Sequence, residues 1–307
     1  MKRFITIDDN NKDVFDNQWF KEAVLNDSLK TVNSLSGGKT SSYIAANYKS
    51  DYNIFSLVRT NDKKCMFPDA KVRQMVSDRL GVEFIGTLEE DTIIYTMLDL
   101  EQFIGSKIDW VTGLTFEEVI KNKSNYLPNI AARFCTTEMK LKPMFDWWLK
   151  EIDEPIKMRI GFRANEQSRA KNMIAKTNEL GLSEFKHVIG KHKNGNNKWC
   201  TTGWQLPDFP LIKEAIYKDN VEAFWKDKPV RFAYMNNCIG CFHRSEPLLK
   251  HMSDRHPNKY NWFAEMENNN KSTFKKGISY EKIKKRFKQI TLFDDDFNSC
   301  ESGSCGL

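Results

Sequence analysis

The feature of this sequence that most constrains its fold is a short apolar segment that leads through two glycines into a helix-forming stretch. Residues 29–35 (Leu-Lys-Thr-Val-Asn-Ser-Leu) have the composition of a buried strand. Ser36, Gly37 and Gly38 follow, and residues 41–46 favour a helix. Glycines let the backbone turn tightly around an anion, and the free amide groups at the start of a helix point toward it. The segment therefore predicts a strand, a phosphate-binding loop and a helix.

Strand-like and helix-like segments alternate over the first half of the chain. Strands are predicted at residues 29–35, 53–60, 82–87 and 156–162, and helices at 41–46, 69–80 and 129–152, the last one interrupted by Pro143. Such alternation is typical of a parallel sheet flanked by helices. We therefore expect an α/β fold whose sheet ends at residue 162.

The composition changes near residue 190, where a loop rich in Lys and Asn begins. We therefore expect a nucleotide-binding domain over residues 1–190 and a smaller, cysteine-containing C-terminal region over residues 191–307. Within that region, helices are predicted around 221–225 and over 280–288, and an acidic tail follows them.

Composition is that of a folded protein, with 40% hydrophobic residues. The N-terminus has no apolar run of signal-peptide length, and no later segment approaches the roughly 18 apolar residues of a membrane span, so a cytoplasmic protein without a membrane partner is expected. In a reducing compartment, seven cysteines point to metal ligation or redox chemistry rather than to disulfides. The net charge of +6 suits nucleic acid and, equally, a phosphate-rich small molecule.

The glycine loop does not have the spacing of a nucleoside triphosphatase P-loop. The pattern G-x-x-x-x-G-K-[ST] would need glycine at position 33, which is Asn33. The loop instead resembles the SGGxDS loop of the PP-loop superfamily, which includes ATP pyrophosphatases and the sulfonucleotide (PAPS and APS) reductases. The resemblance implies an adenine nucleotide alpha-hydrolase-like fold and an adenine nucleotide bound by Ser36, Gly37, Gly38, Lys39, Thr40 and Ser41.

The loop departs from the family pattern at one position and also has an alternative interpretation. Thr40 stands where the family has Asp, a residue associated with the members that cleave ATP. An ordinary glycine turn at the start of a helix is the alternative interpretation of the same residues.

A second candidate for anion binding follows the strand predicted at 156–162. Gly161, Arg163, Glu166 and Arg169 lie in the sequence Gly-Phe-Arg-Ala-Asn-Glu-Gln-Ser-Arg. Ligands of open parallel sheets bind at the carboxyl ends of the strands. Two arginines beside a glutamate suit an anion held by paired N–H groups, with the glutamate orienting a guanidinium. The segment resembles G-x-R-x-x-E-S-x-x-R of the PAPS reductase family, although the spacing from Glu166 to Arg169 is one residue shorter. The alternative interpretation is a charged turn exposed to solvent.

Five cysteines are candidates for a metal centre or a reactive thiol. Cys238 and Cys241 form a C-x-x-C pair around a glycine, so that two thiolates can face one centre. Cys135 opens a predicted helix, where the helix dipole lowers the pKa of a thiol. Cys300 and Cys305 lie in a tail of small residues that ends in Cys-Gly-Leu. Five candidates thus compete for the usual four positions.

The family resemblance extends to these cysteines. APS reductases bind a [4Fe-4S] cluster through a tandem cysteine pair and a distant C-x-x-C, and they carry a nucleophilic cysteine in a C-terminal tail. The resemblance implies an iron-sulfur cluster on Cys135, Cys238, Cys241 and Cys300, and a catalytic thiol at Cys305. In the alternative, Cys238, Cys241, Cys300 and Cys305 form a closed zinc site, and Cys135 lies near the nucleotide. Thiolate ligation suits either metal.

The resemblance runs from about residue 29 to 246 and returns in the last few residues, and it leads to three hypotheses of function. The first is a sulfonucleotide reductase in which the Cys305 thiolate attacks sulfur, sulfite is released and a thioredoxin-like thiol donor resolves the intermediate. The second is an ATP-dependent sulfur-transfer or nucleic-acid-modifying enzyme, like those of DNA phosphorothioation and tRNA thiolation. The third is a non-catalytic PP-loop subunit, which Thr40 would suit.

Overall fold

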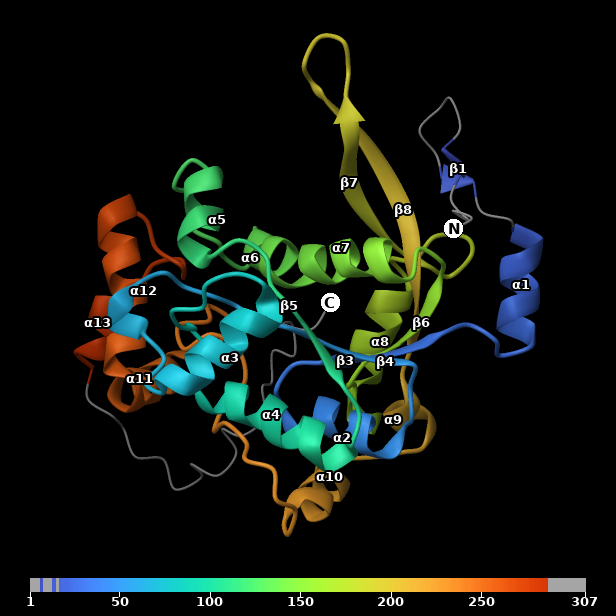
Figure 1. The fold of residues 1–307 in the computed structure, drawn as a ribbon. Coiled ribbons are helices and arrows are strands. Elements are labelled where there is room, and N and C mark those ends of the chain that lie inside the picture. Colours follow the sequence, from blue (N-terminus) through green and yellow to red (C-terminus); the bar gives the residue numbers. More distant parts are fainter. Residues whose placement is uncertain (1–5, 8–12, 15–16, 287–307) are drawn as a thin grey trace.

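A computed structural model describes residues 6–7, 13–14 and 17–286 of the chain. Its centre is a six-stranded sheet with the strand order β5-β4-β3-β6-β8-β7 (Figure 1). The strands are β3 (Thr31–Leu35), β4 (Tyr52–Ser56), β5 (Ile108–Val111), β6 (Ile156–Arg159), β7 (Ser183–Lys191) and β8 (Asn197–Asp208). Neighbouring strands run parallel, except that β7 and β8 form an antiparallel hairpin. The protein is therefore α/β, with a mostly parallel sheet, as the alternation of segments predicts.

The chain enters this sheet near its centre and changes side between β3 and β6. From β3 it continues to β4 and β5 on one side, and it then returns to β6, which pairs with the other edge of β3. The loops that follow β3 and β6 therefore part at a topological switch point, where open α/β sheets leave a crevice for ligands. Ser36 directly follows β3, and Gly161 comes shortly after β6. Both predicted anion-binding segments thus begin at this switch point.

Helices make up a large part of the remaining described chain. They are α1 (Asn17–Leu25), α2 (Lys39–Asn47), α3 (Ala70–Leu80), α4 (Thr92–Ile104), α5 (Phe116–Asn122), α6 (Phe134–Thr136), α7 (Lys142–Glu151), α8 (Gln167–Ile174), α9 (Pro210–Lys213), α10 (Lys218–Trp225), α11 (Glu246–Arg255), α12 (Pro257–Asn270) and α13 (Tyr280–Lys284). Shorter elements are 3-10 helices at Lys63–Cys65 and Ala164–Glu166, a π-helix at Thr137–Leu141, and the two-residue strands β1 (Thr6–Ile7) and β2 (Asp13–Val14). Within the described residues, no helix combines the length and the apolar character needed to cross a membrane.

Each face of the sheet is covered by its own set of helices. Successive residues of a strand point to opposite faces, so Ile54 and Phe55 of β4 belong to different cores. Phe55 packs with α3, α4 and α10, whereas Ile54 packs with α7 and α8. A third apolar cluster joins α5, α11, α12 and α13 beside the sheet (Figure 1). The segment that contains Cys238 belongs to this third cluster, next to the end of the sheet.

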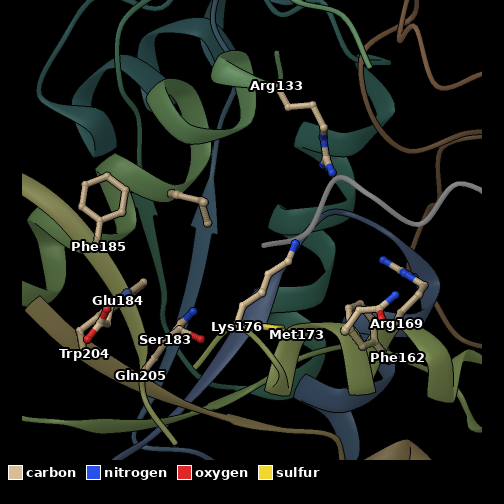
Figure 2. A pocket seen from close by; sticks show the side chains of 12 residues that line it. Arg133, Phe162, Arg169, Met173, Lys176, Ser183, Glu184, Phe185, Trp204 and Gln205 are labelled. Atoms are coloured by element: carbon tan, nitrogen blue, oxygen red, sulfur yellow. The ribbon is translucent and has the colours of Figure 1, made fainter. Parts of the chain in front are cut away.

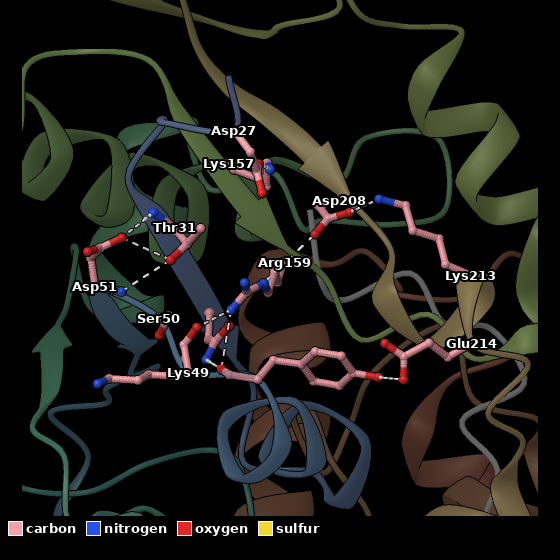
Figure 3. A network of polar contacts seen from close by, with 12 residues as sticks. Asp27, Thr31, Lys49, Ser50, Asp51, Lys157, Arg159, Asp208, Lys213 and Glu214 are labelled. Carbon is pink, nitrogen blue, oxygen red and sulfur yellow. Dashed lines mark hydrogen bonds and ion pairs between the residues drawn. The ribbon is translucent and has the colours of Figure 1, made fainter. Parts of the chain in front are cut away.

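Polar contacts fix the far end of α2 to the sheet (Figure 3). Arg159, the last residue of β6, donates from Nη1 to the carbonyl oxygens of Tyr48 and Lys49, at 3.2 and 2.6 Å. The buried Asn33 side chain also donates to the Tyr48 carbonyl, at 3.0 Å, and to Asn53 Oδ1. Carbonyl groups at the end of a helix have no partner within the helix, so these contacts satisfy them. Because the glycine loop leads directly into α2, the same contacts help to position the loop.

The structure corrects two expectations about the sheet. Residues 82–87 are not a strand, because they form only isolated bridges from Gly86 to Thr60 and Met66. The edge of β4 that such a strand would need is occupied by β5, which the sequence analysis did not predict. The sheet also does not end at residue 162, because β8 pairs with β6 and carries β7 beyond it. The residue-190 boundary falls within this hairpin, so residues from both predicted regions share the sheet.

The helix predicted over 129–152 is shorter than expected, and its α-helical hydrogen bonding is interrupted directly before Pro143 by the π-helix Thr137–Leu141. It begins at Phe134, because the Asn129 side chain accepts hydrogen bonds from the backbone of Ala131 and Ala132 and forms a local turn instead. Pro143 lies in the first turn of α7, directly after this π-helix, so the hydrogen-bond pattern changes where the proline has no N–H group to donate. The predicted helices at 69–80 and 221–225 are confirmed in α3 and α10, and the one predicted over 280–288 is present as the shorter α13, which ends at Lys284.

Candidate functional site

The glycine loop is held in one shape by contacts on both sides. Gly37 has φ +79°, and a Cβ at this position would lie 2.6 Å from Ile93 Cγ2, so only glycine fits without strain. The Ser41 hydroxyl accepts from the Ser36 N–H and donates to the Gly38 carbonyl, both at 3.1 Å. Gly38 is the N-cap residue of α2, and no side chain of the described residues makes a capping hydrogen bond there. The amide groups of the first turn of α2 are therefore available to an anion.

The loop and the arginine segment meet at one cavity. A Cβ on Gly161 would lie 3.3 Å from the Ser41 amide nitrogen, so the backbone after β6 packs directly against the first turn of α2. Lys39, Thr40 and Arg163 line the same cavity of about 270 Å³, which we call the loop cavity. Its other walls come from α10 and from residues 232–236. Two motifs far apart in the sequence are therefore brought together at the switch point.

Glu166 organises the arginines of the second motif. Its carboxylate accepts from the backbone and Nε of Arg163, at 2.9 and 3.0 Å, and forms an ion pair with Arg169. Burial alone would raise the pKa of Glu166, but the backbone N–H and the positive charge of Arg163, with the charge of Arg169, lower it below its ordinary value. The guanidinium of Arg169 lies over the Phe162 ring, 4.1 Å from its centroid. One carboxylate thus orients two guanidinium groups that face different cavities.

Replacing Glu166 with Gln is expected to lower the free energy of unfolding by about 2 kcal/mol at pH 7, because two charge-assisted contacts lose their acceptor charge. The pKa of Glu166 is lower in the folded state than its ordinary value of 4.5. Its contribution is therefore complete above pH 4.5 and is lost as the pH falls through the lowered pKa. Urea denaturation between pH 3 and 7 would measure this change in the free energy of unfolding. The control is Glu281→Gln, which removes the acid of the exposed pair Glu281–Lys285. An equal effect in both variants would contradict the role of Glu166.

Three of the candidate cysteines line a second cavity, of about 40 Å³, which we call the cysteine cavity. Cys135 comes from α6, and Cys238 and Cys241 come from a tight turn in which the Cys241 N–H donates to the Cys238 carbonyl at 3.1 Å. A Cβ on Gly240 would lie 2.4 Å from the Phe263 ring, which explains the glycine inside the C-x-x-C pair. Phe116, Phe242 and Phe263 give the cavity an apolar wall.

A buried arginine fixes the turn that carries the C-x-x-C pair. Arg244 is 5% exposed, and its Nη2 donates to the carbonyl oxygens of Asn236, Asn237 and Cys238, at 2.7, 3.2 and 3.2 Å. His243 lines the cysteine cavity as well, and burial, together with the charges of Arg133 and Lys275, lowers its pKa to about 4. His243 is therefore neutral near pH 7.

Acidic residues that the sequence analysis overlooked connect the two cavities. The buried Glu90 accepts from the Met235 N–H at 2.6 Å and lies 3.3 Å from His256 Nε2, and these contacts lower the pKa of Glu90 against the effect of burial. Glu89 pairs with Lys140, on the wall of the cysteine cavity, at 2.9 Å. The sequence signal that could have identified these acidic residues is the run Glu-Glu-Asp at 89–91, directly before an apolar helix.

Residues 235–238 pass from one cavity to the other. Met235 and Asn236 line the loop cavity, and the next two residues line the cysteine cavity. Asn236 also approaches the glycine loop closely, because a Cβ on Gly38 would lie 2.1 Å from its Nδ2. The two candidate sites are therefore adjacent.

The structure does not bring all of the predicted site residues together. Lys39, Thr40 and Arg163 line the loop cavity, and Cys135, Cys238 and Cys241 line the cysteine cavity. Arg169 lines neither of them. Cys300 and Cys305 lie outside the described residues. Within the described part of the chain, no three His, Cys, Asp or Glu side chains are already arranged to hold a metal ion.

Comparison of the chain with protein-family models, with curated proteins and with solved structures finds no match.

Proposed function

We propose that this protein is a PP-loop enzyme that binds an adenine nucleotide in the loop cavity, and that it is a sulfonucleotide reductase. The observation that carries the proposal is that Lys39 and Thr40 of the glycine loop share one cavity with Arg163, at the switch point of a parallel sheet. Crevices of this kind bind nucleotides in open α/β sheets. The order of the SGGxDS-like and G-x-R-x-x-E-like segments along the chain supports the PP-loop assignment.

In this proposal each part of the loop cavity has a role toward the nucleotide. The uncapped amide groups at the start of α2 bind a phosphate group, and Gly37 and Gly38 let the backbone approach it. Arg163 binds a second anionic group of the nucleotide, held in position by Glu166. Lys39 is paired with Glu222 of α10 and stays at the rim of the cavity, where it can turn toward the ligand.

The proposed reaction uses thiols as the source of electrons. The thiolate of Cys305 attacks the sulfur of the sulfonucleotide, so that a Cys305 Sγ–S bond forms, the S–O bond breaks and the nucleotide phosphate leaves. A dithiol donor of the thioredoxin type then attacks Cys305 Sγ and releases sulfite, and its second thiol resolves the mixed disulfide. Sulfur gains two electrons, and the donor is oxidised to a disulfide.

The cysteine cavity fits a thiolate-bound metal by the chemistry of its donors. Cys135, Cys238 and Cys241 line it, and soft thiolate ligands suit iron-sulfur clusters and zinc. In the proposal Cys300 is the fourth ligand of a [4Fe-4S] cluster. When bound, such a cluster would supply redox-active iron next to the loop cavity. The convergence of Cys135 with the C-x-x-C pair supports this ligand set over the one that excludes Cys135.

A second candidate function is an ATP-dependent sulfur transfer to nucleic acid. The observation that favours it is the β7–β8 hairpin, which projects from the sheet and carries Lys186, Lys191, Lys193 and Lys198 (Figure 1). A projecting basic hairpin suits a polyanionic acceptor.

Product analysis with purified, anaerobically handled protein separates the candidates. With a dithiol donor present, sulfite from PAPS or APS is expected, whereas pyrophosphate from ATP, dependent on nucleic acid, would favour the second candidate. Arg163→Ala is expected to weaken nucleotide binding at least tenfold, because it removes a charge-assisted contact. The control Arg79→Ala removes an ion-paired arginine on α3 and should change binding less than twofold. Absence of binding to PAPS, APS and ATP alike would refute both candidates.

A further inference from the structure

A third cavity, of about 320 Å³, lies between α8 and the base of the β7–β8 hairpin, and we call it the basic cleft. Arg133, Arg169 and Lys176 line it, together with Phe185 and Gln205 (Figure 2). Figure 2 shows Arg133 and Lys176 extending toward each other, with Ser183 and Gln205 on the hairpin side. The volume of the basic cleft is at the lower end of the range for small-molecule sites.

Positive charge dominates the basic cleft. Arg169 shares Glu166 with Arg163, so one carboxylate serves two guanidinium groups. The Nε of Arg133 is buried and has no hydrogen-bond partner among the residues that the structure describes. Among the residues that line the cleft, Glu184 is acidic, and its carboxylate accepts a hydrogen bond from the side chain of Asn178 at 3.1 Å. A ligand with more than one negative charge, such as a phosphate monoester, would therefore be attracted.

A buried amide in the cleft also lacks a partner. Gln205 of β8 is 3% exposed and lines the cleft, yet its Oε1 accepts no hydrogen bond from any described residue. Buried polar groups in native proteins are normally satisfied, and those that are not call for an explanation. A ligand with an N–H or O–H group facing Gln205 would satisfy this amide.

An aromatic wall completes the cleft. Phe185 of β7 is half-buried and stacks on Phe145, with ring centroids 4.8 Å apart, which holds its ring in place. The buried Trp204 and Phe162 close the cleft beneath. A rigid aromatic surface suits a planar ring, as in the stacking of nucleobases on protein side chains.

We propose that the basic cleft binds a nucleoside phosphate as the second substrate or acceptor, separate from the nucleotide of the loop cavity. The phosphate lies among Arg133, Arg169 and Lys176, and the base lies on Phe185 with a donor group toward Gln205. The ligand is either a free nucleotide or a nucleotide within a strand, whose neighbours would follow the basic hairpin. Because Glu166 contacts Arg163 of the loop cavity and Arg169 of the cleft, the two sites adjoin each other.

Calorimetry with the nucleoside monophosphates CMP and UMP, and anisotropy with a labelled single-stranded 12-mer, test the proposal on the full chain. Arg133→Ala and Lys176→Ala are each expected to weaken binding at least fivefold and to lessen its salt dependence. Lys171→Ala, an exposed lysine on α8 outside the cleft, should change binding less than twofold. Gln205→Leu removes the amide toward which the donor group of the base is directed, so any difference in affinity between CMP and UMP is expected to become smaller.

The outcomes also separate the sources of the ligand and the two sites. If Lys191→Ala and Lys193→Ala weaken binding of the 12-mer and not of CMP, the ligand is a nucleotide within a strand; if CMP binds and the 12-mer does not, it is a free nucleotide. Lys39→Ala changes the loop cavity and should alter the affinity for CMP and for the 12-mer less than twofold. The proposed function can therefore fail without deciding whether the basic cleft binds a nucleoside phosphate. Absence of binding to both probes, or binding unaffected by Arg133→Ala and Lys176→Ala, would overturn the proposal.

Discussion

Cys305→Ser is expected to abolish sulfite release from a sulfonucleotide, with a fall of at least about a thousandfold, while nucleotide binding stays within about twofold of the unchanged chain. A serine hydroxyl is not ionised near neutral pH and is a poor nucleophile toward sulfur, so the first bond-forming step would fail. Lys39, Thr40 and Arg163 line the loop cavity in which the nucleotide is proposed to bind, and this change leaves them intact. Sulfite assays and calorimetry with PAPS and APS measure the two quantities.

A buried thiol provides the control for this experiment. Cys65 is 2% exposed, and burial raises its pKa to about 12, so it is not expected to react. Cys65→Ala should therefore retain sulfite release per folded molecule. Undiminished release from Cys305→Ser would exclude Cys305 as the nucleophile. Loss of nucleotide binding in that variant would instead assign Cys305 to the binding site.

The strand, the glycine loop and the helix that follows them could be predicted because their signals are local. Residues 29–35 have the composition of a buried strand, and the glycines that follow have a conformational reason to be there. Asn33 illustrates the limit of such reasoning. Its identity argued against a P-loop, and the structure adds that it is a buried side chain bonded to Tyr48 and Asn53. That role depends on a neighbouring strand and could not be read from the motif.

The parts of the fold that escaped prediction depend on non-local pairing. β5 has only four residues, Ile-Asp-Trp-Val, and nothing in so short a run distinguishes it from a loop. β8 pairs with β6 although the partners lie far apart in the sequence, as Gln205 opposite Ile156, 49 positions earlier, illustrates. The basic cleft was missed for the same reason, since Arg133, Lys176 and Gln205 share no motif and meet only through the fold.

The arrangement of the cysteines depends partly on a local signal and partly on a long-range contact. The spacing of Cys238 and Cys241 is a local signal, and the tight turn that it predicts is present. That Cys135 lines the same cavity is a long-range contact, which the family resemblance implied and the spacing alone did not. The assignment of Cys300 or Cys305 as the remaining ligand stays a prediction, because both lie outside the described residues.

Cys238→Ser is expected to remove the metal of the anaerobically purified protein, because it deletes one thiolate ligand from the cysteine cavity. For the proposed ligand set, the unchanged chain should be brown and contain about four iron atoms. Cys135→Ser should lose the iron as well, whereas Cys305→Ser should keep it. Iron and zinc analysis, together with visible absorbance, measures the result, and Cys65→Ala is again the control.

The same three variants identify the ligand set whichever metal is present. If the metal is about one zinc, lost in Cys305→Ser and kept in Cys135→Ser, the closed site of Cys238, Cys241, Cys300 and Cys305 is correct. Loss in Cys135→Ser with retention in Cys305→Ser would leave Cys305 available as a nucleophile, as the proposed reaction requires. A full metal content in Cys238→Ser would contradict both sets, since Cys238 belongs to each. The metal content of these variants therefore also tests whether the thiol chemistry and the metal centre can coexist in this chain.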